Sequence, residues 1–349
     1  EADEAPGRIQ NLTAQFADAS LNGVVKFSAP THTFDGEHAL TGKLAYRLWV
    51  NDVEKAKGEV EAGKDVAVDV AVGEGLNQFV VAVSNDKGQG PKQKITQYVG
   101  FDYPVAPSQV KLAVDAQHKA TVSWKAPVAG THGGHIGALN YNVYRIKGKD
   151  TVEVMSGTAS THFEEVLPGG TLKTYSYGVV AVNNTKRSAM AVSNTSVVGE
   201  SLEMPFFDDF NESIALYTVI DANNDKSTWS WDQDKKAAKY TFSYQNKAND
   251  WLISPPLQLE AGKTYKVSYK ACASGGSYFP ERIEAKWGKD KTIEAMTKEL
   301  TPATELNDDN YQYFEKEISP DANGKYYVGF HAISNASRAL LYLDSLRVE

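Results

Sequence analysis

Hydrophobic and polar residues alternate with a period of two along much of the chain. Clear examples are residues 120–124 (ATVSW), 141–144 (YNVY) and 175–181 (YSYGVVA). This alternation is typical of β-strands that bury one face. Clusters of Gly, Pro, Asn and Asp separate such segments, as at residues 85–88 (NDKG) and 168–170 (PGG). No helical stripe of comparable length competes, so the sequence predicts an all-β protein of short antiparallel strands.

The first part of the chain contains two copies of one pattern. The segment FSAP at residues 27–30 aligns with WKAP at residues 124–127, 97 residues further on. The segment AVSN at residues 82–85 aligns with AVNN at residues 181–184, 99 residues further on. Small drifts in the offset indicate loop insertions between matched strands. A period near 97 residues is too long for a solenoid repeat, so the sequence predicts two tandem domains.

Two features predict the domain boundaries. Residues 101–107 (FDYPVAP) hold two prolines, which remove backbone donors and favour an extended linker. The aromatic content changes near Pro205, with 15 aromatic residues before it and 22 from it to the end. The predicted division is an N-terminal tail at 1–7, domains at 8–103 and 104–203, and a larger domain at 204–349.

The second copy resembles a fibronectin type III domain. The resemblance rests on Trp124 in the second expected strand, on YNVYR at residues 141–145, and on Leu172 and Tyr175 followed by AVN. It implies an immunoglobulin-like sandwich with a tyrosine corner, in which the hydroxyl of Tyr175 bonds back to the backbone. Phe27 stands where the pattern expects Trp, so the first copy is interpreted as a diverged domain of the same kind.

The third segment carries four ordered motifs. They are PFFDDFN at 205–211, YTVIDANND at 217–225, NDWLISPPL at 249–257 and LLYLDSLRV at 340–348. Together they resemble the cleaved-adhesin or choice-of-anchor J domains of Bacteroidetes-type surface proteins, including the haemagglutinin regions of gingipains. The segment is also similar to carbohydrate-binding and MAM-like sandwiches. The resemblance implies a C-terminal jelly-roll β-sandwich.

A jelly roll places its first and last strands side by side, which makes a metal site between them possible. Asp208 or Asp209 near the start of the domain could then approach Asp344 at its end. The resemblance implies a structural Ca²⁺ ion there, with Asp250 or Asn249 as a further ligand, because Ca²⁺ takes six to eight oxygen ligands. Asp344 interrupts an apolar strand, and a buried carboxylate needs a partner. The alternative is that the two early aspartates are solvated edge residues that discourage aggregation.

Residues 221–225 (DANND) form a second Asp- and Asn-rich loop. Its alternate acidic positions are typical of calcium loops, but the Gly and Glu that an EF-hand requires at positions six and twelve are missing. We favour a turn built on the tolerance of Asn and Asp for left-handed backbone over a metal loop.

Aromatic residues in polar surroundings are the candidate ligand-binding groups. Tyr278 and Phe279 follow a flexible Ser/Gly run, and Trp229, Trp231 and Trp287 lie among polar residues. Exposed rings can stack on sugar faces or anchor a protein partner. The alternative for each ring is packing in a small β-core.

Composition and charge narrow the function further. The 349 residues are 42% hydrophobic and 23% charged, as in globular proteins, and the net charge of −8 disfavours general nucleic-acid binding. Cys272 is the single cysteine, so an internal disulfide is impossible. No apolar run approaches the roughly 20 residues of a membrane span. Because the sequence begins at Glu1 with a small, acidic stretch, we expect an exported chain whose signal has been removed; a segment from within a cytosolic protein is the alternative. We also expect a monomer.

The sequence supports neither a catalytic site nor a zinc site. His132 and His135 supply two ligands where a structural zinc site needs four, so a Gly-rich turn is favoured. There is no Gly-x-Ser-x-Gly elbow, and Cys272 lies in an apparent buried strand. The leading hypothesis is a non-enzymatic, secreted or surface-associated protein that binds a glycan or a host or envelope protein. Accessory modules of a larger secreted peptidase or glycoside hydrolase, and a structural surface-layer component, are the alternatives.

Overall fold

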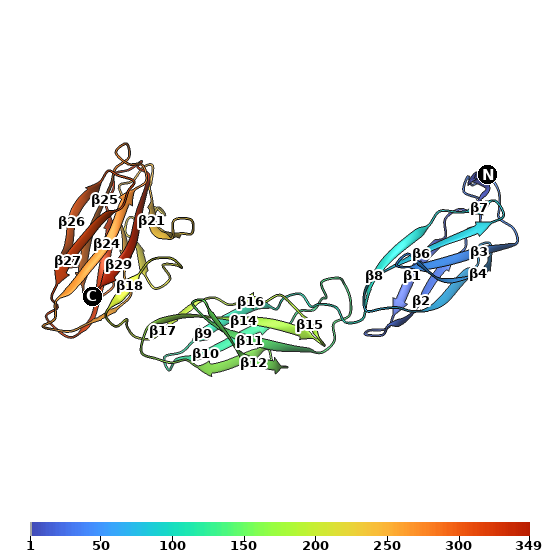
Figure 1. The fold of residues 1–349 in the computed structure, drawn as a ribbon, viewed down its shortest axis with the longest axis horizontal. Helices are drawn as coiled ribbons and strands as arrows, with labels where there is room; N and C mark the ends of the chain where they lie inside the picture. The colour runs from blue at the N-terminus through green and yellow to red at the C-terminus, as the bar shows by residue number, and fades with distance from the viewer. Residues whose placement is uncertain (1) are drawn as a thin grey trace. The chain divides into compact units, whose positions relative to one another are not determined.

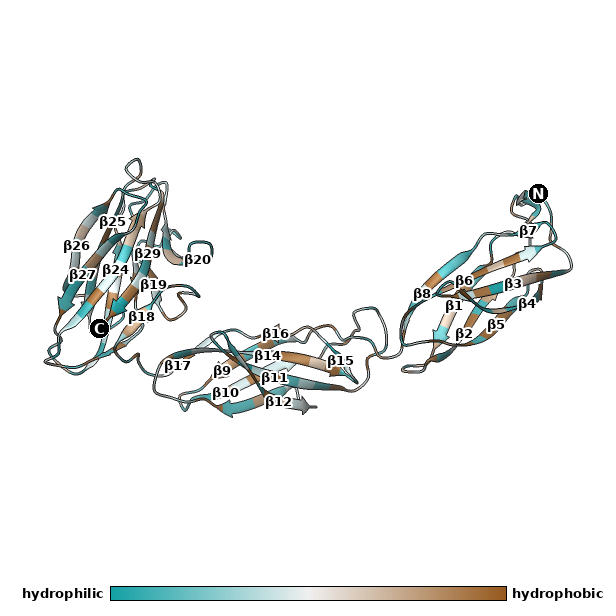
Figure 2. Cartoon of the chain, in the orientation of Figure 1, coloured by the Kyte–Doolittle hydropathy of each residue, from teal (hydrophilic) through white to brown (hydrophobic). Residues whose placement is uncertain are grey.

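The computed structural model describes residues 2–349, and its regular elements are β-strands apart from one short 3-10 turn, η1 (Ala2–Glu4). The strands form three β-sandwiches in succession along the chain (Figure 1). Hydrophobic and hydrophilic residues alternate along many of these strands (Figure 2). The predicted all-β fold class is therefore confirmed.

The first sandwich has one sheet of three strands and one of five. The smaller sheet has the order β1-β2-β5, with bounds Gln10–Phe16, Asn22–Ser28 and Asp65–Ala71. The larger sheet has the order β4-β3-β6-β7, with β8 paired to β6, and its bounds are Val53–Glu61, Lys43–Val50, Gly75–Asn85, Gly88–Gln89 and Gln93–Val99. The inward-facing residues of both sheets pack into one apolar core that includes Phe27, Leu48 and Phe79.

The second sandwich repeats this arrangement. Its smaller sheet has the order β13-β10-β9, with bounds His162–Val166, Lys119–Lys125 and Ser108–Val114. Its larger sheet has the order β12-β11-β14-β15, with bounds Asp150–Thr158, Leu139–Lys147, Lys173–Asn183 and Lys186–Arg187; β16 (Ala191–Val192) and β17 (Ser196–Val198) also pair with β14. In its core Trp124 packs edge-on against Tyr141, with ring centroids 5.4 Å apart.

The two sandwiches share one strand order, which agrees with the tandem repeat in the sequence. Strands β1, β2 and β5 correspond to β9, β10 and β13, and β4, β3 and β6 correspond to β12, β11 and β14. The expected tyrosine corner differs in detail. Tyr175 is buried, but within the described residues its hydroxyl makes no hydrogen bond, whereas the hydroxyl of Tyr177 donates to Glu165 Oε1 at 2.5 Å. The hydroxyl of Tyr177 thus bonds to a side chain on β13.

The C-terminal sandwich consists of two six-stranded sheets. The first has the order β20-β21-β29-β24-β27, with β18 paired to β29, and its bounds are Trp229–Asp232, Ala237–Thr241, Leu340–Val348, Tyr265–Ala273, Gln312–Ile318 and Phe206–Asp208. The second has the order β19-β22-β28-β25-β26, with β23 paired to β28, and its bounds are Thr218–Asp221, Asp250–Ile253, Gly324–Ala332, Glu281–Gly288, Lys298–Leu306 and Leu257–Leu259. Strands β18 and β29 are antiparallel neighbours, with Asp208 opposite Leu346. The first and last strands therefore lie side by side, as expected.

The domain boundaries drawn from the sequence stay a prediction. Contacts divide the chain into two compact units rather than three. One unit contains residues up to 113 together with 120–165 and 176–195, and the other contains 114–119, 166–175 and 196–349.

Asp102, in the segment predicted as an extended linker, is a fully buried carboxylate within the first of these units. It accepts hydrogen bonds from the backbone N–H groups of Tyr103, His132 and Gly134 and from the His132 ring, at 2.7–2.9 Å. Burial pushes the pKa of Asp102 up, but these hydrogen bonds, led by that of the His132 ring, outweigh it and leave the pKa below its usual value. The carboxylate thus ties the linker to the loop that carries His132.

The glycines of this loop are needed for that contact. A Cβ added to Gly134 would lie 2.8 Å from the Cβ of Asp102, and one added to Gly130 would lie 2.3 Å from Asp102 Oδ2. The ring of Tyr98 stacks on His132 with centroids 4.8 Å apart. The Gly- and His-rich turn at residues 130–135 therefore holds the buried carboxylate of Asp102.

Replacing Asp102 with Ala should loosen this loop. Three backbone N–H groups would lose their acceptor, and a net loss of about 3 kcal/mol corresponds to roughly 100-fold faster local amide exchange. Hydrogen exchange over residues 130–135 at pH 7 measures it, with Asp86→Ala, at an exposed turn position, as the control. Because the pKa of Asp102 is lowered in the folded state, its contribution is present above about pH 4 and is lost as the pH falls further. Equal protection in both variants would contradict the role assigned to Asp102.

Candidate metal centre and aromatic loops

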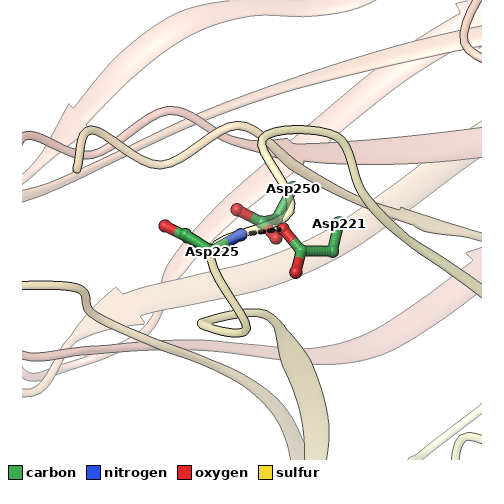
Figure 3. Close-up of side chains that lie close together, drawn as sticks. All are labelled: Asp221, Asp225 and Asp250. Atoms are coloured by element: carbon green, nitrogen blue, oxygen red, sulfur yellow. Dashed lines mark hydrogen bonds between the residues drawn. The ribbon is translucent and has the colours of Figure 1, made fainter.

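Three aspartates gather at one end of the C-terminal sandwich. Asp221 ends β19, Asp250 begins β22, and antiparallel pairing places the two residues directly opposite each other. Asp225 lies in the turn that follows β19. One carboxylate oxygen from each residue lies within 4.8 Å of those of the other two. Figure 3 shows the three side chains around one small space.

Hydrogen bonds fix the turn that carries two of these acids. Asp221 accepts bonds from the backbone N–H groups of Asp225 and Lys226 at 3.3 and 2.9 Å, and Asp225 accepts one from Ser227 at 3.0 Å. Asn224 and Lys226 have φ values of 52° and 69°, in the left-handed region that Asn tolerates well. The turn favoured from the sequence is therefore present, and it also directs two carboxylates toward Asp250.

Asp250 is the chemically unusual member of this group. Its side chain is 0% exposed, and while Oδ1 accepts a 3.1 Å bond from the Asn249 N–H, Oδ2 has no hydrogen-bond partner within the described residues. Burial raises the pKa of Asp250 to about 7 and repulsion from Asp221 and Asp225 adds to the rise, whereas the Asn249 N–H and the neighbouring Thr228 hydroxyl favour its charged form. A buried carboxylate oxygen without a partner is costly, and either a proton or a cation relieves that cost.

The donor set matches a hard cation. Three carboxylates supply oxygen ligands and up to three negative charges, which is the chemistry that Ca²⁺ prefers. Asn223, on the same turn, has a buried Oδ1 that also has no partner in the described part of the chain. Its amide nitrogen instead donates to Lys247 O at 2.9 Å, which links this turn to the loop before β22.

Of the metal ligands predicted from the sequence, only Asp250 belongs to this group. Asp208 uses its oxygens to accept bonds from the Phe210 N–H and the Tyr217 hydroxyl, both at 2.8 Å. Asp344 accepts a 2.7 Å bond from the Ser345 N–H. Burial raises the pKa values of Asp208 and Asp344, but neither they nor the exposed Asp209 join a group of three ligating side chains among residues 2–349. The acidic group lies at the β19–β22 pair, not at the first and last strands.

The predicted ligand-binding aromatics separate into two kinds. Trp229 is 3% exposed, and its indole N–H donates to the backbone oxygen of Asp250 at 3.0 Å. Trp287 is also buried, in the central core of the sandwich. Both tryptophan rings therefore pack in the β-core, which was the alternative for each ring, instead of lying exposed among their polar neighbours. Tyr278 and Phe279, by contrast, are 88% and 47% exposed.

A third exposed ring lies on a neighbouring loop. Tyr244 is 78% exposed and packs edge-on against Phe242 at 4.9 Å. Its backbone oxygen accepts a bond from the Ser337 hydroxyl, and the Leu340 N–H donates to the Ser274 hydroxyl at 2.9 Å. The loop between β28 and β29 therefore joins the loop of Tyr244 to the loop of Tyr278. Because Ala248 N also donates to Ser334 O at 2.8 Å, these loops and the acidic group share one end of the sandwich.

A scan against protein-family models and a search of curated proteins find no match. Among solved structures, the K1 cleaved adhesin domain of Lys-gingipain from Porphyromonas gingivalis W83 is 14% identical, covering 42% of this chain and 98% of that chain with a TM-score of 0.35. A two-domain fibronectin type III segment of chicken tenascin is 13% identical, covering 54% and 98% with a TM-score of 0.25. The CBM22-1 xylan-binding domain of Paenibacillus barcinonensis Xyn10C is 12% identical, covering 41% and 92% with a TM-score of 0.30. The first two are the kinds of domain that the sequence resembles, and the likeness concerns the fold alone.

The part of the chain that the structure describes contains no helix that is long and apolar enough to cross a membrane.

Metal-free protein should become less stable as the pH rises from about 4 to 7. Over this range folded Asp250, with a pKa of about 7, holds a proton that the unfolded chain has released, so unfolding becomes easier with rising pH. Asp250→Asn keeps the shape without the charge and should stabilise the chelator-treated protein at pH 8 by on the order of 2 kcal/mol. Thermal unfolding at pH 5 and pH 8 measures this, with Asp209→Asn as the control. An unchanged pH dependence in Asp250→Asn would rule out the carboxylate as its source.

Proposed function

We propose that this chain is a non-enzymatic, exported binding protein of the adhesion type. In this proposal two fibronectin type III-like domains act as spacers for a C-terminal jelly roll, which contacts an extracellular glycan or a host or envelope protein. The observation that carries the proposal is the buried, unpartnered oxygen of Asp250 within a group of three acids at the base of exposed aromatic loops.

Calcium has a structural role in this proposal. Asp221, Asp225 and Asp250 hold Ca²⁺, which replaces their mutual repulsion with attraction and supplies the missing partner of Asp250. The ion joins the turn after β19 to the start of β22, and the bond from Asn223 to Lys247 O extends that order to the next loop. A chain whose single cysteine excludes an internal disulfide gains a non-covalent cross-link in this way.

The aromatic loops supply the binding surface. Tyr244, Tyr278 and Phe279 present flat apolar area to solvent on backbone that hydrogen bonds to the loop between β28 and β29. Ordered rings contact a sugar face or an apolar protein patch with little loss of side-chain entropy. This reasoning adds Tyr244 to the residues expected from the sequence.

Calcium should bind to the chelator-treated protein and raise the melting temperature of the C-terminal sandwich by several degrees, since a ligand at 100 times its Kd contributes about 2.7 kcal/mol. Asp225→Asn retains the turn acceptor but removes a charge, and it should weaken Ca²⁺ binding at least tenfold by calorimetric titration. Asp344→Asn is the matched control, because it tests the site expected at the last strand. No binding below millimolar Ca²⁺, or a loss confined to Asp344→Asn, would refute the assignment.

Replacing the exposed rings should abolish binding without unfolding the domain. Tyr278→Ala combined with Phe279→Ala, and separately Tyr244→Ala, should lower binding to a glycan array and to bacterial and host cell surfaces more than tenfold at unchanged melting temperature. Tyr313→Ala is the control, because Tyr313 is a comparably exposed aromatic residue on strand β27. Wild-type levels of binding by all loop variants would exclude the loops as the contact surface.

A further inference from the structure

A pocket of about 380 Å³ lies at the other end of β25 from the aromatic loops. Its lining includes Trp287 from β25, Lys298 from β26 and Tyr326 from β28. Pockets for small ligands usually measure about 300–1,000 Å³, so this one suits one or two sugar residues rather than a long chain.

The pocket is built on a fixed frame. The rings of Trp287 and Tyr326 lie 5.7 Å apart, and the Tyr326 hydroxyl donates to Ala322 O at 2.8 Å, which holds the loop after β27. A Cβ on Gly288 would lie 1.8 Å from Ala295 O, so this glycine permits the loop after β25 to close against the strand. Met296 of the same loop is buried in an apolar cluster with Trp251. Packing therefore fixes the apolar part of the pocket at Trp287 and Tyr326, while Lys289, Lys298 and Asp321 line it as exposed side chains.

Charge distinguishes this pocket from the rest of an acidic chain. Lys289 pairs with Asp321 at 3.0 Å, and Lys298, which has no carboxylate within ion-pair distance among the described residues, lies near enough to the same Asp321 to help lower its pKa. Its Nζ lies 4.8 Å from the centroid of the Trp287 ring, which lies opposite it in the β25–β26 register. The pocket thus combines two ammonium groups, one carboxylate and an aromatic wall, and carries a net positive charge within a chain of net charge −8.

We infer that this pocket binds an acidic sugar, a pyranose ring that carries a carboxylate. The carboxylate pairs with Lys298, the ring packs on the apolar surface beside Trp287, and the Lys289–Asp321 pair offers a donor and an acceptor to ring hydroxyls. The inference rests on the proposed function, because it names a ligand class for the same jelly roll, but it uses neither the metal group nor the aromatic loops.

The test compares two uronate probes with their uncharged methyl esters. Trigalacturonate and a hyaluronan hexasaccharide are titrated calorimetrically into the full chain at saturating Ca²⁺, and we expect at least one acid form to bind at least tenfold more tightly than its ester. Lys298→Met keeps the apolar stem and should abolish this preference, whereas Lys298→Arg should retain it. Lys316→Met, at an exposed position on β27, should leave it unchanged.

Several results would overturn the inference. These are no binding of either probe, equal binding of acid and ester, or an equal loss in Lys298→Met and Lys316→Met, which would indicate non-specific attraction. Binding that is lost in Asp225→Asn but kept in Lys298→Met would place the uronate on the metal group instead. None of these outcomes changes the results expected for Ca²⁺ binding or for the loop variants. A failure of the uronate inference is therefore distinguishable from a failure of the proposed function.

Discussion

Packing between two sheets is the interaction on which each sandwich depends, because the single cysteine, Cys272, allows no internal disulfide and is itself buried. Alternation along the strands sends one set of side chains inward, and in the C-terminal sandwich these form one core around Tyr240, Tyr269 and Phe330. A fully buried side chain of this size contributes about 1.5–3 kcal/mol. A polar group is tolerated in such a core only when it has a hydrogen-bond or ionic partner. The partners of each buried carboxylate therefore indicate what that carboxylate does.

Two buried aspartates have opposite pKa shifts because their hydrogen-bond environments differ. Asp102 and Asp250 are both fully buried, yet the pKa of Asp102 is lowered and that of Asp250 is raised. Asp102 receives N–H donors on both oxygens, so its charge is solvated by the protein and its role is structural. Asp250 keeps one oxygen without a donor and faces two further carboxylates. The second arrangement is the basis of the proposed cation site, whereas the Asp102 carboxylate already has its hydrogen-bond donors.

The sequence predicts those features that depend on local periodicity, and it fails where long-range register decides. Alternation and the repeat near 97 residues are both present, whereas the pairing of the first and last strands was expected from the resemblance to jelly-roll domains rather than from local periodicity. The group of three aspartates could not be derived, because nothing local indicates that Asp221 pairs with Asp250 across β19 and β22. The exposure of Tyr278 agrees with its place after a Ser/Gly run, but the burial of Trp229 depends on which face of β20 meets the core. The acidic turn at residues 221–225 was visible in the sequence, but a turn was favoured there over a metal loop.

The proposed sites of the C-terminal sandwich lie at opposite ends of one strand. Strand β25 begins at Glu281, beside the loop of Tyr278, and ends at Gly288, which lines the pocket of Trp287 and Lys298. Eight residues of extended chain span roughly 24 Å, and this separation is too large for one or two sugar residues to bridge. The metal group and aromatic loops therefore cannot act as a single subsite with the pocket. A long polysaccharide or a surface coated with many chains could engage both ends, and two weak contacts joined in one rigid domain give an avidity that neither reaches alone.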